Sequence, residues 1–238
     1  MTTAGRAVSI AAAGTVVAAA GLWAPSLVVL APRSAQAFGV RARFPGLDGV
    51  VLTFDDGPHP DGTPAVLAEL DRASAPAIFF VTGAAVDRDP RLACAIVGAG
   101  HEIGIHGYCH QSRRQWTQRS AMDDTRRALT AVTVATGVRP RFYRPPHGTM
   151  TFPGRRAVRG LGLEPLLWSR WGRDWREGVT PGSIARSATH GIARGDVVLL
   201  HDSDAHGAAE SWRRTAAALP LVLEAIHAAG HRVVLPGA

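Results

Sequence analysis

The chain has 238 residues, of which 26 are basic and 19 acidic, so its formal net charge is +7. Every basic residue among the 26 is arginine, which excludes Schiff-base lysine chemistry, a phosphate-loop lysine and a Ser-Lys dyad. Hydrophobic residues make up 46% and charged residues 19%, a globular balance that excludes a disordered or fibrous chain. The length fits one α/β barrel or two smaller domains.

Residues 1–37 have the pattern of an export leader. They contain no acidic residue, and no charge lies between Arg6 and Arg33. The sequence Ala35-Gln36-Ala37 fits a small-x-small cleavage site, which favours a signal peptide removed after Ala37. The apolar stretch is also long enough to span a bilayer, so an uncleaved membrane anchor is the alternative. Either interpretation predicts a secreted or envelope protein, with a net charge of +5 once the two arginines of the leader are removed.

Beyond the leader, short apolar runs that predict strands alternate with amphipathic stretches that predict helices. A strand over 49–54 is followed by a helix capped by Thr63 with Pro64 in its first turn. The remaining predicted elements, in chain order, are strand 77–81, helix 89–100, strand 102–106, helix 120–136, strand 142–144, helix 152–160, strand 163–168, helix 180–193, strand 196–201, helix 213–229 and strand 232–235.

This alternation of about seven strands with helices predicts a parallel α/β fold, and we expect one domain over 38–238. In such folds the functional side chains lie at the carboxyl ends of the strands. Cys94 and Cys109 are the two cysteines, and an oxidising compartment permits a disulfide that the sequence does not settle.

Carboxylates and histidines follow two of the predicted strands. Asp55 and Asp56 end the first strand, where two adjacent carboxylates are costly unless a cation relieves their repulsion. The alternative is a simple Asp-Gly-Pro turn. His106 and His110 follow the third strand with a spacing that lets both face one centre. Carboxylate and histidine together suit zinc or another borderline divalent metal, with a coordination position left open for water.

Three further strand ends carry candidate residues. Arg144 follows the fourth strand and could orient a catalytic carboxylate, although a surface arginine is the plain alternative. Three tryptophans at 168, 171 and 175 suggest a pocket wall or a sugar-stacking surface, or else core packing. His201 ends the sixth strand and could act as general acid with Asp174 as its partner. Asp202 and Asp204 are expected to bond the loop, and His147 is ambiguous. The other histidines are expected to be structural or on the surface: His59, His101, His190, His206, His227 and His231.

The ordered set of motifs resembles the polysaccharide deacetylases of the NodB-homology type, carbohydrate esterase family 4. The motifs are Thr-Phe-Asp-Asp-Gly-Pro, His-x-x-x-His, Arg-x-Pro, Asp-Trp and Leu-x-His, and the resemblance covers about residues 47–235. It implies a distorted (β/α) barrel, in agreement with the alternation of elements.

The resemblance also implies a role for each motif residue. Asp55 would be the catalytic base, braced by Arg144, and His201 the general acid, tuned by Asp174. Three residues would bind a divalent metal ion, zinc first, with cobalt or another divalent ion as alternatives: Asp56, His106 and His110. Three more would form the substrate pocket, with the backbone N–H of His147 binding the oxyanion: His147, Trp175 and Leu199.

The chain departs from the family pattern at three positions. His147 stands where tyrosine is usual, and Trp171 where the fourth motif often has an aspartate. Gly107 replaces the usual serine or threonine, so the hydroxyl that steadies the metal-binding segment is missing. These departures concern substrate preference more than catalysis.

The expected function is metal-dependent hydrolysis of N- or O-acetyl groups on a polysaccharide such as chitin oligomers, peptidoglycan or xylan. The alternatives are an amidase acting on a small non-sugar amide and a non-catalytic glycan-binding envelope protein. The arginine pairs fall mostly in helical stretches and indicate solvated faces, so no nucleic-acid partner is expected. A monomer is expected, with membrane contact only through an uncleaved leader.

Overall fold

The computed structural model describes residues 39–110 and 118–237, so the predicted leader lies outside the described residues. Within them the strands form one parallel sheet in the order β5-β4-β3-β2-β1-β7-β6. The strands are β1 (Val51–Asp55), β2 (Ala77–Val81), β3 (Glu102–Ile105), β4 (Phe142–Tyr143), β5 (Glu164–Pro165), β6 (Arg170–Trp171) and β7 (Val197–His201).

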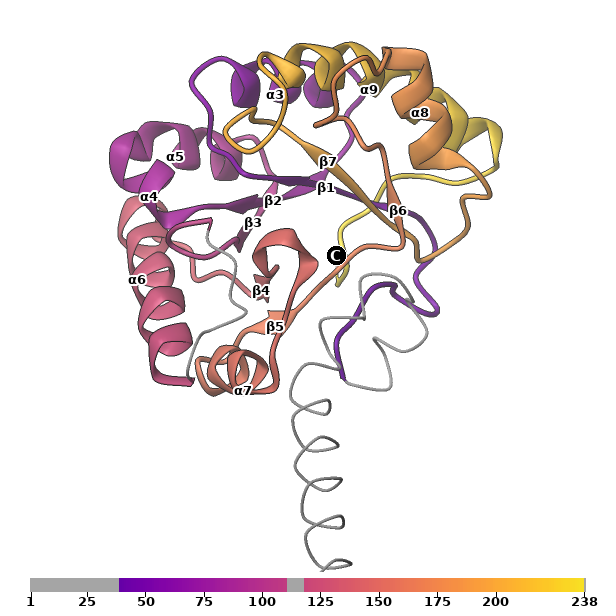
Figure 1. Cartoon of the computed structure of the whole chain (residues 1–238). Helices are drawn as coiled ribbons and strands as arrows, with labels where there is room; N and C mark the ends of the chain where they lie inside the picture. Colours follow the sequence, from indigo (N-terminus) through magenta and orange to yellow (C-terminus); the bar gives the residue numbers. More distant parts are fainter. Residues whose placement is uncertain (1–38, 111–117, 238) are drawn as a thin grey trace, which may run out of the picture.

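Helices surround the outside of this curled sheet (Figure 1). They are α3 (Gly62–Arg72), α4 (Gly83–Arg88), α5 (Pro90–Gly98), α6 (Gln118–Thr136), α7 (Phe152–Gly160), α8 (Pro181–Thr189) and α9 (Ser211–Ala228), with a 3-10 turn η2 (Pro146–Gly148). Neighbouring helices pack on one another, α3 on α9, α9 on α8, α4 and α5 on α6, and α6 on α7. The predicted barrel-like α/β fold is confirmed.

The sheet carries apolar side chains on both faces, and each face contributes to a different hydrophobic cluster. Along β1, Leu52 and Phe54 belong to the large cluster under the helices, while Val51 belongs to a smaller cluster inside the barrel. Successive side chains of a strand point to opposite faces, so Thr53 and Asp55 share the inner side with Val51. The residue order of β1 thereby directs a carboxylate into the barrel at the carboxyl end of its strand.

The barrel is open between its edge strands β5 and β6, and an irregular segment fills part of this gap. Arg41 forms a parallel bridge with Leu166, just past β5, and Arg43 forms an antiparallel bridge with Asp196, just before β7. Phe44 then inserts its ring into the inner cluster. The segment that precedes β1 therefore covers part of the gap between the edge strands without adding a strand.

Two predicted strands were wrong in their extent. The prediction over 163–168 is reduced to β5, and β6 lies beyond that range and was not predicted, because the chain leaves β4 after β5 and pairs with β7 at the other edge of the sheet. The prediction over 232–235 is reduced to one bridge between Val50 and Val233. Since β1 is paired with β7 from Val51 onward and with β2 from Leu52 onward, Val50 is left to pair with this segment.

Several helix predictions also needed correction. Thr63 does not cap α3, which begins one residue earlier; its hydroxyl instead donates to Asp202. Helix α4 was not predicted, and α8 ends at Thr189 rather than at 193. By contrast, α5 begins at the predicted Asp89-Pro90, where the Asp89 side chain accepts from the N–H of Arg91.

The two cysteines do not pair. Cys94 is exposed and donates from Sγ to the Ala135 carbonyl at 3.1 Å, and Cys109 is also a free thiol. Among the helices in 39–110 and 118–237, none has both the length and the apolar character needed to cross a bilayer.

Candidate active site

A pocket of about 250 Å³ opens where the carboxyl ends of the strands converge. Its lining contains most of the side chains that the motifs singled out, brought from positions far apart in the sequence. They are Asp55, Asp56, His106, His110, His147, Gly148, Trp168, Trp171, Trp175, Leu199, His201 and His206. The strand-end rule applied to the sequence is thus satisfied by the tertiary structure.

Asp55 is held by a buried arginine. Arg144, which is fully buried, donates from Nη1 to Asp55 Oδ1 at 2.7 Å. The second oxygen, Asp55 Oδ2, is left facing the pocket, 3.7 Å from His106 Nε2. The arginine therefore fixes the orientation of the carboxylate while one of its oxygens stays available for chemistry.

Arg144 crosses the inside of the barrel in a cradle of acceptors. Nε donates to the Leu166 carbonyl and Nη2 to the Leu167 carbonyl, at 3.1 and 3.0 Å. Nη1 also donates to the hydroxyl of Thr53 at 2.8 Å, and the guanidinium lies 4.0 Å above the Phe80 ring. Gly104 makes room for that ring, because a Cβ there would lie 2.7 Å from it. This buried charge is compensated by hydrogen bonds and one carboxylate.

A second group consists of Asp56, His106 and His110. It lies next to Oδ2 of Asp55, whereas Arg144 contacts Oδ1. Asp56 Oδ1 lies 3.3 Å from His106 Nε2 and 3.4 Å from His110 Nε2. His106 Nδ1 is 2.9 Å from the Arg144 carbonyl, which leaves Nε2 directed at the carboxylate. Asp56 adopts a left-handed backbone conformation with φ of 76° that turns its side chain toward the histidines.

The three residues fit a divalent cation. One potential ligand atom from each lies within 4.8 Å of the others, and the set of one carboxylate and two imidazoles is one that zinc accepts. Asp56 Oδ1 is buried and has no hydrogen-bond partner among the described residues. A buried carboxylate oxygen without a partner is costly, and a cation would supply the missing interaction.

The charges of this group shift the pKa values within it. Burial by itself raises the pKa of Asp56, but contact with His106 and the charges of His201 and His110 outweigh it, so the pKa lies well below its usual range. Burial, together with the neighbouring His106, lowers the pKa of His110 to about 3. Both groups therefore occupy the ligand-competent states, carboxylate and neutral imidazole.

His201 faces these groups from β7, and its Cα is paired in register with that of Asp55. Its Nδ1 lies 2.9 Å from Asp174 Oδ1, and its own backbone N–H donates to Asp174 Oδ2 at 2.7 Å. The hydroxyl of Thr215 donates to the same Oδ2. Burial opposes the charging of His201, but Asp174 outweighs it and the pKa rises to about 9.

The pocket wall beside His201 is aromatic. The Trp175 ring meets His201 edge to face at 5.3 Å, and Trp171 lies 5.5 Å from Trp175 and 6.0 Å from Trp168, centroid to centroid. Leu199 is buried at the pocket floor. Of the two sequence interpretations for the tryptophans, pocket wall or core, the structure favours the wall.

Two further histidines, outside the group of Asp56, His106 and His110, pack against His110. The exposed His147 ring lies 4.4 Å away, edge to face, and the exposed His206 ring stacks on His110 at 3.8 Å. His206, predicted to be a structural or surface residue, is exposed and also lines the pocket, which the sequence analysis did not anticipate. Its position five residues after the end of β7 was a usable signal.

Other polar residues near the site have supporting contacts. Asp202 accepts from Thr63, and burial raises its pKa to about 7. Asp204 accepts from the backbone of Glu210, as expected for a loop aspartate. Sequence reasoning missed Thr53 and Thr215, whose hydroxyls support Arg144 and Asp174; a lone threonine in a strand or helix carries no recognisable signal.

The chain matches the model of the polysaccharide deacetylase family over residues 45–166. It is 32% identical over 191 residues to the peptidoglycan-N-acetylglucosamine deacetylase of Bacillus cereus, covering 78% of this chain and 84% of that protein. It is 34% identical over 207 residues to a chitooligosaccharide deacetylase of a Bradyrhizobium species, covering 82% and 94%. A family 4 carbohydrate esterase of Streptomyces lividans, solved with acetate, superposes with a TM-score of 0.71 at 28% identity, over 80% and 94% of the two chains.

The fold, the family model and the relatives therefore agree with the resemblance that the ordered motifs indicated. This chain belongs to the polysaccharide deacetylase family, carbohydrate esterase family 4.

Proposed function

We propose that this chain removes N-acetyl groups from N-acetylglucosamine units of a polysaccharide, with a divalent cation as cofactor. Zinc is the first candidate for that cation. One observation carries the proposal: three groups with different chemistry surround a single pocket. These are the Arg144-held Asp55, the trio of Asp56, His106 and His110, and the Asp174-held His201. The names of the Bacillus and Bradyrhizobium relatives support an N-acetylated glycan as substrate.

Asp56, His106 and His110 would hold the cation. When bound there, it would supply positive charge that acidifies water and polarises the acetyl carbonyl. Donation from His106 Nδ1 to the Arg144 carbonyl would keep the ligand nitrogen directed at the site.

Asp55 would act as general base through Oδ2, taking a proton from the attacking water as the new C–O bond forms at the acetyl carbon. Arg144 keeps the other oxygen occupied, so the carboxylate cannot rotate away from the pocket. The backbone N–H of His147 would donate to the developing oxyanion. Leu199 and Trp175 would line the space for the acetyl methyl group.

His201 would act as general acid. Asp174 holds Nδ1, so Nε2 is the nitrogen left to carry a proton into the pocket. That proton would pass to the leaving nitrogen as the C–N bond breaks, releasing acetate and a free amine. The raised pKa keeps His201 protonated at neutral pH, as a general acid requires.

We also propose that the protein works outside the cytoplasm as a monomer. The leader pattern of residues 1–37 supports export, and the Bacillus relative is named for a cell-wall substrate.

The test is acetate release from chitin oligomers, peptidoglycan and acetylxylan. We expect release from the first two, loss of activity with a chelator, and recovery with zinc or cobalt. Asp55→Asn should lower kcat by at least about 100-fold. Asp71→Asn, the same charge change at an exposed position on α3, should leave kcat unchanged.

Chelator-insensitive release, or full activity in Asp55→Asn, would overturn the proposed mechanism. Release from acetylxylan alone would replace N-acetyl by O-acetyl groups as the target, and hydrolysis of small amides alone would indicate an amidase.

A further inference from the structure

The segment between the two proposed metal ligands His106 and His110 consists of Gly107, Tyr108 and Cys109, here called the metal loop. Gly107 has a φ of 83°, in the left-handed region, and provides no side chain. The hydroxyl that the family resemblance places at this position is therefore absent. Since the spacing of the two histidines depends on the path of this loop, other residues have to hold it.

Helix α4 holds the loop from one side, because backbone N–H groups of the helix donate to carbonyl groups of the loop. The N–H of Gly83 donates to the Gly107 carbonyl at 2.9 Å, and the N–H of Ala84 donates to the Tyr108 carbonyl at 3.0 Å. These donors belong to the first turn of α4, where N–H groups have no partner within the helix. These contacts satisfy the carbonyls of Gly107 and Tyr108, but they give no partner to the N–H groups of Tyr108 and Cys109.

Helix α6 satisfies those N–H groups with a single carboxylate. Asp124 Oδ2 accepts from the N–H of Tyr108 at 3.0 Å, and Oδ1 accepts from the N–H of Cys109 at 3.4 Å. A carboxylate bridging two consecutive N–H groups restrains both peptide planes at once, and such charge-assisted bonds are stronger than neutral ones.

The side chain of Tyr108 ties the same helices together. Its hydroxyl donates to Asp87 Oδ2 on α4 at 2.8 Å and accepts from Arg127 Nη2 on α6 at 2.7 Å. The guanidinium of Arg127 also lies 3.5 Å above the tyrosine ring. Arg127 is one helical turn after Asp124, so one face of α6 provides both contacts.

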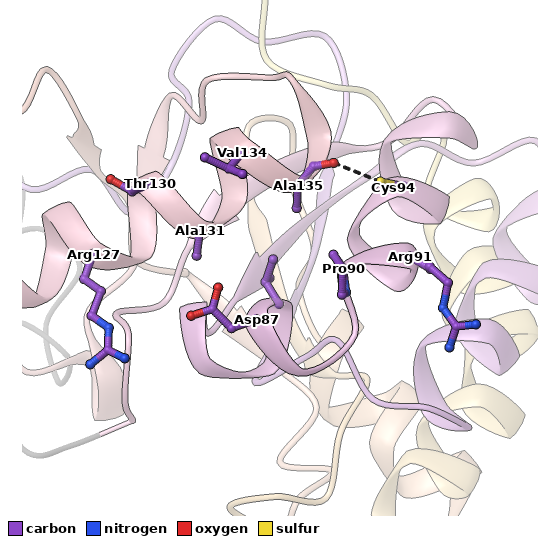
Figure 2. A pocket seen from close by; sticks show the side chains of 10 residues that line it. Asp87, Pro90, Arg91, Cys94, Arg127, Thr130, Ala131, Val134 and Ala135 are labelled. Carbon is purple, nitrogen blue, oxygen red and sulfur yellow. Dashed lines mark hydrogen bonds between the residues drawn. The ribbon is translucent and has the colours of Figure 1, made fainter.

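Asp87 and Arg127 also line a cavity of about 710 Å³ between α4, α5 and α6, and Figure 2 shows them among its side chains. This cavity shares no lining residue with the active-site pocket. His106 and His110 at the two ends of the metal loop line the catalytic pocket, whereas the loop between them is held by helices α4 and α6.

We propose that Asp124 is a positioning residue that sets the geometry of His106 and His110 by holding the metal loop. The inference rests on the proposed function, because it takes these histidines as metal ligands. Asp124 does not contact the reacting atoms, and it takes over the part that a loop hydroxyl plays in the family pattern. Residues that orient metal ligands typically affect metal affinity by about 10–100-fold.

The experiment compares Asp124→Ala and Asp124→Asn with Asp123→Asn, in the full chain. Asp123 is the preceding residue on α6, is exposed, and forms an ion pair only with Arg126 among the described residues, so its variant controls for the change of charge. The readouts are the zinc dissociation constant from competition with a chromophoric chelator, and the visible absorption spectrum of the cobalt-loaded protein. Urea unfolding of the metal-free proteins reports folding separately.

We expect Asp124→Ala to weaken zinc binding by about 10–100-fold and to change the intensity of the cobalt bands. Asp124→Asn retains one acceptor oxygen and should weaken zinc binding less, in a protein that is folded. Asp123→Asn should match the wild type in both readouts.

The inference would be overturned if both Asp124→Asn and a folded Asp124→Ala protein kept the zinc affinity and the cobalt spectrum of the wild type. If zinc affinity then still falls in His106→Ala, the proposed metal site stands and only the role of Asp124 fails. If His106→Ala also binds zinc as the wild type does, the metal site and the inference fail together.

Discussion

Arg144 shows how one residue connects the stability of the barrel with its chemistry. Four of its hydrogen bonds go to groups from two separate segments: Thr53 and Asp55 on β1, and the carbonyls of Leu166 and Leu167. Burial lowers the pKa of Arg144, and the Asp55 carboxylate opposes this effect. Removing either partner would leave an uncompensated buried charge, which typically costs about 3–5 kcal/mol. The residue is therefore tied to the fold as strongly as to catalysis.

The pH dependence belongs to the same residue scale. If His201 donates a proton, activity persists below its pKa of about 9 and declines as the pH rises through that value. Asp174→Asn removes the partner that raises this pKa, while burial continues to lower it. We expect the alkaline limb of kcat to move to lower pH by about one to three units.

The measurement is the pH profile of kcat with Glu177→Gln as control, since Glu177 is an exposed acid three residues further along the chain. An unchanged alkaline limb in Asp174→Asn would show that His201 is not the group being titrated.

At the scale of elements, α4, the metal loop and α6 form one packed unit. Gly83 begins α4, and a Cβ there would lie 2.7 Å from Tyr108 Cδ2 and 2.8 Å from the Cα of Ala128 on α6. The close approach lets the first turn of α4 reach the loop carbonyls. A glycine with ordinary helical φ is needed here because of space, not because of backbone conformation.

Gly83→Ala should therefore destabilise the protein by about 1–3 kcal/mol, since the atoms it meets include backbone. Gly98→Ala, at the end of α5 with no atom within 4 Å of the new Cβ, should stabilise it by about 0.5–1 kcal/mol. Urea unfolding of the metal-free proteins measures both values. Equal stability of the two variants would contradict the tight packing at Gly83.

At the scale of the whole molecule, we expect the excess of arginine to affect how fast the enzyme binds an anionic polysaccharide substrate. A positive net charge attracts anionic chains at long range, and salt screens the attraction. We expect kcat/KM on peptidoglycan fragments, which carry carboxylates, to fall several-fold over a roughly tenfold rise in ionic strength. Neutral chitin oligomers are the control and should show little change. The same salt response for both substrates would show that net charge does not steer binding.

Much of this architecture could be predicted because its signals are local. The apolar run before Asp55 and the one before His201 each indicate a strand buried on both faces, and both strands are present in the sheet. The candidate residues were then found as carboxylates, histidines and an arginine at the ends of predicted strands. The order of their motifs along the chain indicated the family. The short extent of β5 and the separate strand β6 were missed because pairing partners, not local propensity, decide where short strands begin and end.

The sequence by itself determined the alternation of strands and helices, the placing of carboxylates and histidines after strands, and the family, because these features depend on residue type and spacing. Only the tertiary structure decided which of these side chains meet. Asp55 and Arg144 come together across the barrel, Asp174 reaches His201 from the neighbouring strand end, and Asp124 holds the metal loop from a separate helix. The physical reason is that each of these contacts joins residues distant in sequence, and their distances follow from strand register and helix packing.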